Sequence, residues 1–161
     1  MANSYTNINI HLIFHIKSTA CVMKDEHLTR IFRYIGGYIN SMPGHVYKVG
    51  GCPDHVHILA ALPISVSLAD FVRGIKANTS RWIKGIDSYY HDFSWQAGYG
   101  AFSVSESNKA AVINYINNQK EHHAKHTTQE EFDVFLIKHG ILNTRCQSGL
   151  DGDRGNYDAM E

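Results

Sequence analysis

The chain has 161 residues, of which 43% are hydrophobic and 19% are charged, and its 15 Lys and Arg side chains balance its 15 Asp and Glu. This composition predicts one domain with a packed core and excludes general disorder. No apolar run reaches the roughly 18 residues of a membrane span, and the balanced charge neither requires nor excludes a nucleic-acid partner.

The cysteines and the N-terminus bear on the cellular compartment. Cys21, Cys52 and Cys146 are odd in number and form no C-x-x-C pair, which argues against a disulfide framework and against a Cys-based zinc site. The first residues lack the basic-then-apolar order of a secretory signal. We therefore expect a soluble, cytoplasmic protein that does not associate with a membrane.

The first half of the chain alternates between predicted strands and helices. Asn7–Ile16 alternates apolar and polar residues, which predicts a half-buried strand. Helical spacing over Leu28–Ile39 predicts a helix, ended by Pro43 and Gly44. His45–Val49 and His55–Leu62 are predicted to form two strands joined by an irregular loop.

The next segment predicts a second amphipathic helix. Ser67 begins a capping-box pattern with Asp70, and apolar residues recur at helical spacing as far as Ile86. Residues 87–100 are rich in Tyr, Gly, Asp and Trp and are expected to form a loop. A short strand is predicted at Phe102–Ser105.

The C-terminal part of the chain is expected to contain a long helix over residues 107–125 and a shorter one over Thr128–His139. We predict one domain over residues 1–144, followed by a polar, disordered tail over residues 145–161. The order β-α-β-β-α-β is typical of an α+β fold of the ferredoxin-like, split βαβ type, with a central antiparallel sheet.

His55 and His57 form the first candidate site. Residues i and i+2 of a strand share one face about 6–7 Å apart, so two imidazoles there can bind one metal ion. With 11 His in the chain, an equally weighted alternative is a pair of polar-face or hydrogen-bonded core histidines. Their position next to the loop Gly50–Asp54 favours a site, because functional residues often lie beside loops.

The predicted helix over residues 107–125 carries the second candidate site. Four polar side chains share one stripe of it: Tyr115, Gln119, His122 and His126. Its apolar side is suited to packing: Val112, Ile113 and Ile116. Tyr115 alone is more simply explained by packing, but the neighbouring amide and imidazoles favour a metal or a phosphate.

Four blocks of sequence, in order, point to one family. They are Gly50-Gly51-x-x-Asp54-His55-Val56-His57-Ile58-Leu59, Trp95-x-x-Gly98-Tyr99 leading into Phe102-Ser103-Val104, Tyr115-Ile116-x-Asn118-Gln119-x-x-His122-His123, and Phe135 to Ile141. Over most of residues 5–142 the chain resembles the single-tyrosine HUH transposases of the insertion-sequence-200 type and their domesticated relatives that act on repeated extragenic palindromes.

The resemblance implies a transposase that cleaves and rejoins single-stranded DNA through a 5′-phosphotyrosine intermediate. It implies Tyr115, on a mobile helix, as the nucleophile, and His55, His57 and Gln119 as ligands of Mg²⁺ or Mn²⁺. His122, on the same polar stripe, is a further candidate to support these ligands. A free tyrosine has a pKa near 10, so a Lewis acid beside the phosphate suits this chemistry. The resemblance also implies a homodimer with composite active sites.

DNA contacts are predicted from two further features. One is a set of basic residues on the helix after Ser67, which is as well explained by a solvated helix face: Arg73, Lys76, Arg81 and Lys84. The other is the aromatic segment Tyr89–Trp95, which could stack on the bases of single-stranded or hairpin DNA or belong to the core. Two alternatives to a mobile-element transposase stay open: a domesticated nuclease acting on palindromes and a non-catalytic nucleic-acid-binding module.

Overall fold

The computed structural model describes residues 3–119, 121 and 128–138. The chain divides into two compact units, Met1–Lys120 and Glu121–Glu161. The described part of the second unit contains helix α5, Thr128–Lys138. The predicted tail over residues 145–161 and the candidate His122 lie outside the described residues. No helix in the described part is long and apolar enough to cross a membrane.

The first unit is built on one antiparallel sheet with the strand order β2-β3-β1-β4. Its strands are β1 (Asn9–His15), β2 (His45–Cys52), β3 (His55–Ala61) and β4 (Gly100–Val104). Two helices connect them: α1 (Asp25–Ser41) and α2 (Leu68–Lys84). The order β1-α1-β2-β3-α2-β4 with this pairing confirms the predicted ferredoxin-like, split βαβ fold.

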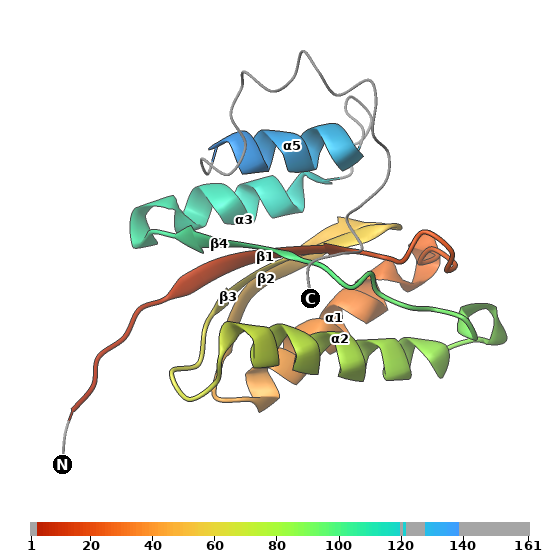
Figure 1. Cartoon of the computed structure of the whole chain (residues 1–161), viewed down its shortest axis with the longest axis horizontal. Coiled ribbons are helices and arrows are strands. Elements are labelled where there is room, and N and C mark those ends of the chain that lie inside the picture. Colours follow the sequence, from red (N-terminus) through yellow and green to blue (C-terminus); the bar gives the residue numbers. More distant parts are fainter. Residues whose placement is uncertain (1–2, 120, 122–127, 139–161) are drawn as a thin grey trace. The chain divides into compact units, whose positions relative to one another are not determined.

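One face of the sheet carries the apolar core, and α1 and α2 cover it (Figure 1). The side chains on this face alternate along β1 and β3, as the period-2 pattern predicts: Ile10, Leu12, Phe14, Val56 and Ile58. They pack against the apolar stripes of the two helices: Leu28, Ile31, Ile35 and Ile39 of α1, and Phe71, Val72 and Ile75 of α2. Burial of these groups is the main source of stability for the unit.

Helix α2 begins at the predicted cap. The hydroxyl of Ser67 accepts a hydrogen bond from the Asp70 backbone N–H at 3.1 Å, which satisfies one of the unpaired donors of the first turn. Such a cap stabilises a helix by about 1 kcal/mol.

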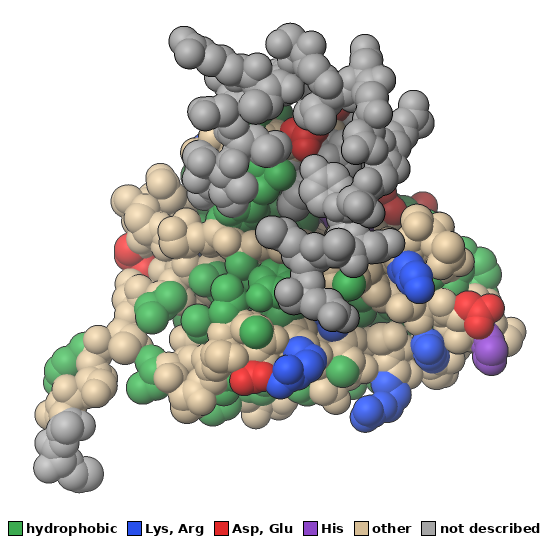
Figure 2. All heavy atoms as spheres, viewed as in Figure 1, with side chains coloured by type: hydrophobic (Ala, Val, Ile, Leu, Met, Phe, Trp, Pro, Cys, Tyr) green, Lys and Arg blue, Asp and Glu red, His purple; other side chains and the backbone are tan. Residues whose placement is uncertain are grey.

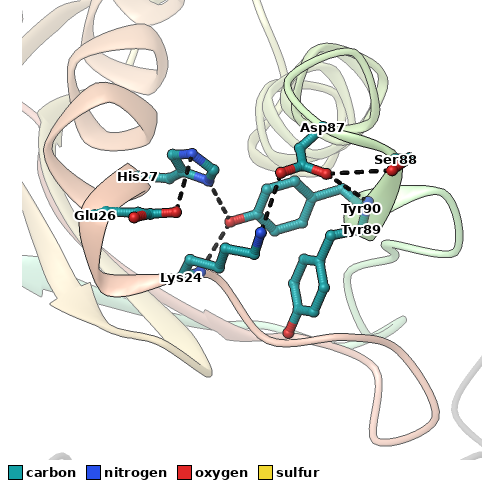
Figure 3. Close-up of polar contacts among 7 residues, drawn as sticks. All are labelled: Lys24, Glu26, His27, Asp87, Ser88, Tyr89 and Tyr90. Carbon is teal, nitrogen blue, oxygen red and sulfur yellow. Dashed lines mark hydrogen bonds and ion pairs between the residues drawn. The ribbon is translucent and has the colours of Figure 1, made fainter.

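A polar cluster fastens the loop after α2 to the start of α1 (Figure 3). The hydroxyl of Tyr90 accepts from the Lys24 backbone N–H at 2.8 Å and is hydrogen-bonded to Nδ1 of His27 at 2.9 Å. The Lys24 ammonium pairs with Asp87 at 3.1 Å. The segment predicted as a loop therefore includes a short 3-10 helix, η1 (Ser88–Tyr90), held in place at both ends.

The aromatic segment after α2 belongs mainly to the core. Tyr90 and Phe93 are fully buried and Trp95 is nearly so, whereas Tyr89 stays 41% exposed. The ring of Trp95 meets the rings of Phe14 and Phe93 edge to face, each with centroids 4.9 Å apart. Of the two explanations for this segment, packing is thus the one that fits Phe93 and Trp95.

On the opposite face of the sheet, α3 (Lys109–Asn117) packs on β2 and β3 and follows the 3-10 turn η2 (Glu106–Asn108) (Figure 1). Both faces of β1 are buried, so the prediction of a half-buried strand is wrong. The predicted single helix over residues 107–125 is interrupted at Asn118. There the backbone N–H turns back to the carbonyls of Asn114 and Tyr115 and closes the helix.

Candidate active site

The face of the sheet beneath α3 carries the candidate histidines. Along β3 the side chains alternate, so Val56 enters the apolar core while His55 and His57 share the opposite face. Their ring centroids lie 5.0 Å apart, and both residues are 1% exposed. The structure thus brings the two imidazoles together as the H-x-H spacing predicts.

Strand β1 adds two more histidines to this face, which the sequence analysis did not single out. His15 lies opposite His55 in the β1–β3 register, and Ile13 lies opposite His57. The ring of His15 is 5.3 Å from that of His55, and the ring of His11 is 5.1 Å from that of His57. The alternation of β1 placed His11 and His15 on one face, but only the strand register places them beside the H-x-H pair.

Both candidate ligands are held through the same ring nitrogen. Nδ1 of His55 lies 2.7 Å from a carboxylate oxygen of Asp54, and Nδ1 of His57 lies 3.0 Å from Nε2 of His11. When Nδ1 donates in such a contact, Nε2 carries the lone pair and is the nitrogen that can bind a metal. Nε2 of His57 is buried within the site.

Tyr115 of the same chain lies against this histidine cluster. Its ring meets that of His57 edge-on, with centroids 5.6 Å apart and an interplanar angle of 78°. The ring of His11 lies 6.2 Å away, also edge-on. The phenolic oxygen is buried although the residue as a whole is half-buried. Tyr115 therefore packs on the rings of His11 and His57, and this packing places its side chain in the candidate site.

Gln119 lies one turn beyond Tyr115 and is also buried, at 1% exposure. Its side-chain amide donates to the Tyr115 carbonyl at 3.4 Å, and its own backbone carbonyl lies 3.8 Å from the sulfur of Cys52. Cys52 is the register partner of His55. Gln119 therefore lies at the end of the sheet that carries His55, and its Oε1 is buried there.

The glycine pair of the motif explains how α3 comes so close to the sheet. Gly50 is the register partner of His57, and a Cβ at this position would lie 2.7 Å from Cγ2 and 3.0 Å from the carbonyl oxygen of Ile116. Gly51 has φ +147°, a conformation that disfavours L side chains, and its Cβ would lie 2.3 Å from the His55 carbonyl. Gly50 thus admits the helix, and Gly51 permits the turn into β3.

The start of α3 is fastened to the sheet by Glu106. Its carboxylate accepts from Lys109 at 2.6 Å, from Asn7 at 3.1 Å and from Asn9 at 3.2 Å. These bonds, that of Lys109 foremost, lower the pKa of Glu106 to about 2. The Lys109 ammonium also lies 4.3 Å from the ring centroid of Tyr47 on β2. The helix that carries Tyr115 is therefore attached to two strands at its first turn.

The basic residues predicted to contact DNA have different surroundings. Lys76 donates to the backbone carbonyls of Gln96, Ala97 and Gly98 at 2.7–3.1 Å, and burial lowers its pKa to about 8. Arg73 pairs with Asp70 on the surface. Arg81 and Lys84 are exposed. On the face shown in Figure 2 the Lys and Arg side chains lie in separate spots rather than in one patch.

The donor set of the site fits a divalent metal. Within the described residues, no group of three His, Cys, Asp or Glu side chains is arranged to hold a metal ion. Two imidazoles can be completed by an amide oxygen, and Gln119 has such an oxygen buried at the His55 end of the sheet. Amide oxygens suit both Mn²⁺ and Mg²⁺, and the two imidazoles favour Mn²⁺ over Mg²⁺.

Comparison with known families decides the wider assignment. The family model described as "Transposase IS200 like" matches residues 4–119, from the segment before β1 through Gln119. The chain belongs to the IS200-like transposase family. The resemblance carried by the motif blocks is thereby confirmed, and the histidine pair and Tyr115 all lie inside the matched segment of this transposase.

Two solved structures share the fold of this transposase. One is assigned as a transposase from Deinococcus radiodurans R1, with 22% identity and a TM-score of 0.56, covering 74% of this chain and 96% of the other. The second is a REP-associated tyrosine transposase bound to a REP hairpin, with 14% identity and a TM-score of 0.54, covering 100% of this chain and 96% of the other. A search of curated proteins found no match.

Proposed function

We propose that this transposase cleaves and rejoins single-stranded DNA with Tyr115 as the nucleophile and with Mg²⁺ or Mn²⁺ held by His55, His57 and Gln119. The observation that carries the proposal is the edge-on contact between the rings of Tyr115 and His57, with centroids 5.6 Å apart. It joins a nucleophile to a metal-ligand candidate within one buried site. Membership of the family is consistent with this chemistry.

The proposed reaction consists of two transesterifications. The phenolic oxygen of Tyr115 forms a bond to the scissile phosphorus, the bond to the 3′ oxygen breaks, the phenol loses its proton and the 3′ oxygen gains one. The products are a 5′-phosphotyrosine and a free 3′-hydroxyl. A second 3′-hydroxyl reverses the step. Because the phosphoester is conserved in covalent form, no nucleotide cofactor is needed. When bound, the divalent ion supplies Lewis-acid stabilisation of the phosphoryl oxygens.

The chain's own residues prepare the nucleophile. A free tyrosine has a pKa near 10, so it is a weak nucleophile at neutral pH and depends on accurate placement. Ile116 packs on Gly50 and fixes the height of α3 above the sheet. Glu106 attaches the first turn of the same helix. These contacts favour one position of the Tyr115 ring against His57.

We propose hairpin-forming single-stranded DNA as the substrate class, since a structural neighbour is bound to a REP hairpin. The same neighbour covers the whole chain, and this favours a domesticated nuclease acting on palindromes as the second candidate. Both candidates use the same chemistry. A non-catalytic nucleic-acid-binding module is the third, and it predicts that Tyr115 is dispensable.

Replacing Tyr115 with Phe tests the proposal directly. We expect Tyr115→Phe to abolish covalent protein–DNA adducts after incubation with a single-stranded hairpin and Mn²⁺, because only the attacking oxygen is removed. Denaturing electrophoresis detects the adduct as a shifted protein band. Tyr34→Phe is the matched control, because Tyr34 stacks on Trp82 away from the site and should leave adducts unchanged. Adducts at the wild-type level in Tyr115→Phe would refute the assignment.

A mixing experiment tests which chain completes the site. Tyr115 and His57 of one chain contact each other, which supports a site completed within the chain; the homodimer with composite sites is the alternative. We expect a mixture of Tyr115→Phe and His57→Ala proteins to form no adduct, because neither chain has an intact site. Adduct formation on the His57→Ala chain would instead demonstrate composite sites.

A further inference from the structure

We propose that His11 is a positioning residue of the transposition site, which accepts the hydrogen bond from Nδ1 of His57 and so supports the tautomer of His57 that can bind metal. This inference rests on the proposed function, in which His57 is a metal ligand. It is carried by the bond between Nε2 of His11 and Nδ1 of His57, 3.0 Å long and buried between two strands.

The neighbouring strands and the burial of His11 restrict the position of its ring. The residue lies in the middle of the sheet, with Leu59 of β3 as its register partner on one side and Phe102 of β4 on the other. It is 1% exposed. A polar ring at such a depth is costly unless it is hydrogen-bonded, and the bond to His57 meets part of that requirement.

The bond between the two rings has two possible arrangements. A neutral imidazole has one N–H, so either His57 donates from Nδ1 or His11 donates from Nε2. In the first arrangement, Nε2 of His57 carries the lone pair that a metal requires. In the second, the same nitrogen carries a proton and cannot bind metal. Metal binding therefore requires His11 to accept the bond and to keep its own proton on Nδ1.

His55 provides the contrast within the same site. Its Nδ1 lies 2.7 Å from Asp54, and an ionised carboxylate only accepts hydrogen bonds. Asp54 therefore dictates the proton on Nδ1 of His55, whereas His11 can act as donor or acceptor toward His57. Hydrogen-bond partners of this kind typically account for about 10–100-fold in metal affinity. The ability of His57 to bind a metal thus depends on the proton position of His11, a residue of the neighbouring strand β1.

The inference can be tested with Mn²⁺ alone as the probe, on the full chain, by electron paramagnetic resonance titration. His11→Phe keeps a ring of similar size but removes the acceptor, and we expect it to weaken Mn²⁺ binding about 10–100-fold. His11→Gln keeps an acceptor on a side chain of similar reach and should restore most of that loss. His91→Phe, at a surface histidine that is 87% exposed, is the matched control and should bind as the wild type does.

Nitrogen NMR gives a second readout that a merely structural role would not produce. In the wild-type protein saturated with diamagnetic Mg²⁺, we expect the proton of His57 to lie on Nδ1. We also expect a scalar coupling across the hydrogen bond between Nδ1 of His57 and Nε2 of His11. The coupling should vanish in His11→Phe. A proton on Nε2 of His57 in the wild-type protein with Mg²⁺ would overturn the inference.

The outcomes separate the inference from the function on which it rests. If the wild-type protein binds no Mn²⁺ and forms no adduct, the proposed function fails and the inference falls with it. If the wild type does both and His11→Phe binds Mn²⁺ equally well, only the inference fails. A loss in His11→Phe that His11→Gln does not repair would show a packing role and would also overturn the inference.

Discussion

The two faces of the sheet are made by the same strands, yet they bury different chemistry. Toward α1 and α2, β1 and β3 present aliphatic and aromatic side chains such as Phe14 and Ile58, which are fully buried. Toward α3 the same strands present histidines together with Ile13 and Leu59, and His11, His55 and His57 are each 1% exposed. The α3 face therefore combines apolar packing with buried polar groups, whereas the other face of these strands is apolar.

This difference shows what an alternating pattern means. Period-2 alternation reports which residues share a face, but it does not report whether the polar face is solvated. On the polar face of β1, His11 lies against Tyr115 of α3, a helix about 100 residues later in the chain. A buried polar face must hydrogen-bond its members, and here the bonds join histidines to one another and to Asp54. Site geometry follows from that requirement.

The largest effect is expected on the apolar face. Phe14 is fully buried between the rings of the core, so Phe14→Ala should lower the free energy of unfolding by about 3–5 kcal/mol. Urea denaturation measures it. Ile58→Val is the milder control on the same face, with about 0.5–1.5 kcal/mol expected. A loss below about 1 kcal/mol for Phe14→Ala would contradict the assignment of this face as the main source of stability.

An intermediate effect on stability, with a larger one on activity, is expected where α3 meets the sheet. In Gly50→Ala the new methyl must displace Ile116, which should cost about 1–3 kcal/mol. Because a misplacement of about 1 Å can cost about 100-fold in rate, adduct formation should fall far more than the folded fraction does.

Gly37→Ala is the matched control for this change. Gly37 lies exposed in α1, and a Cβ added to it would meet no atom within 4 Å, so alanine there should be neutral or stabilise the helix by up to about 1 kcal/mol. Wild-type adduct yield in Gly50→Ala would show that the close approach of α3 is not needed for the reaction.

The smallest effect is expected at Glu106, and it should depend on pH. Since the folded-state pKa is lowered from 4.5 to about 2, its contribution to stability is present above the ordinary pKa and is lost as the pH falls toward the lowered one. Glu106→Gln should therefore destabilise the protein at about pH 6 and matter little at about pH 2. Urea midpoints of both proteins across this range measure the difference. If the difference in urea midpoint between the wild type and Glu106→Gln were the same at every pH, the charge of the carboxylate would contribute nothing to stability.

Much of the fold could be predicted from the sequence because its signals are local. The capping pattern at Ser67 and the periodicity of the two core helices depend on neighbours a few residues away. The interruption at Asn118 was missed because Tyr115 and Gln119 keep helical spacing across it. The role of Lys76 was missed as well, since its carbonyl partners in residues 96–98 come from a loop without periodicity.

The sequence predicts which residues the candidate site brings together but not the residues that support them. The H-x-H spacing and the family blocks point to His55, His57 and Tyr115. The contribution of His11 depends on the register between β1 and β3, and that of Gly50 depends on the distance between α3 and the sheet. The sequence pattern of a single segment contains neither kind of information. Comparable supports in related chains should be sought among residues opposite the motif in the sheet.

Cys52 offers a natural reporter of the α3 side of the sheet. The thiol is 5% exposed and lies 3.8 Å from the backbone oxygen of Gln119. Separation of Gln119 from the end of β2 would expose this thiol to an alkylating reagent. In a variant in which Cys21 and Cys146 are replaced by serine, the rate of alkylation of Cys52 would measure how often this opening occurs. The measurement can be made with and without DNA, and it needs no attached fluorophore.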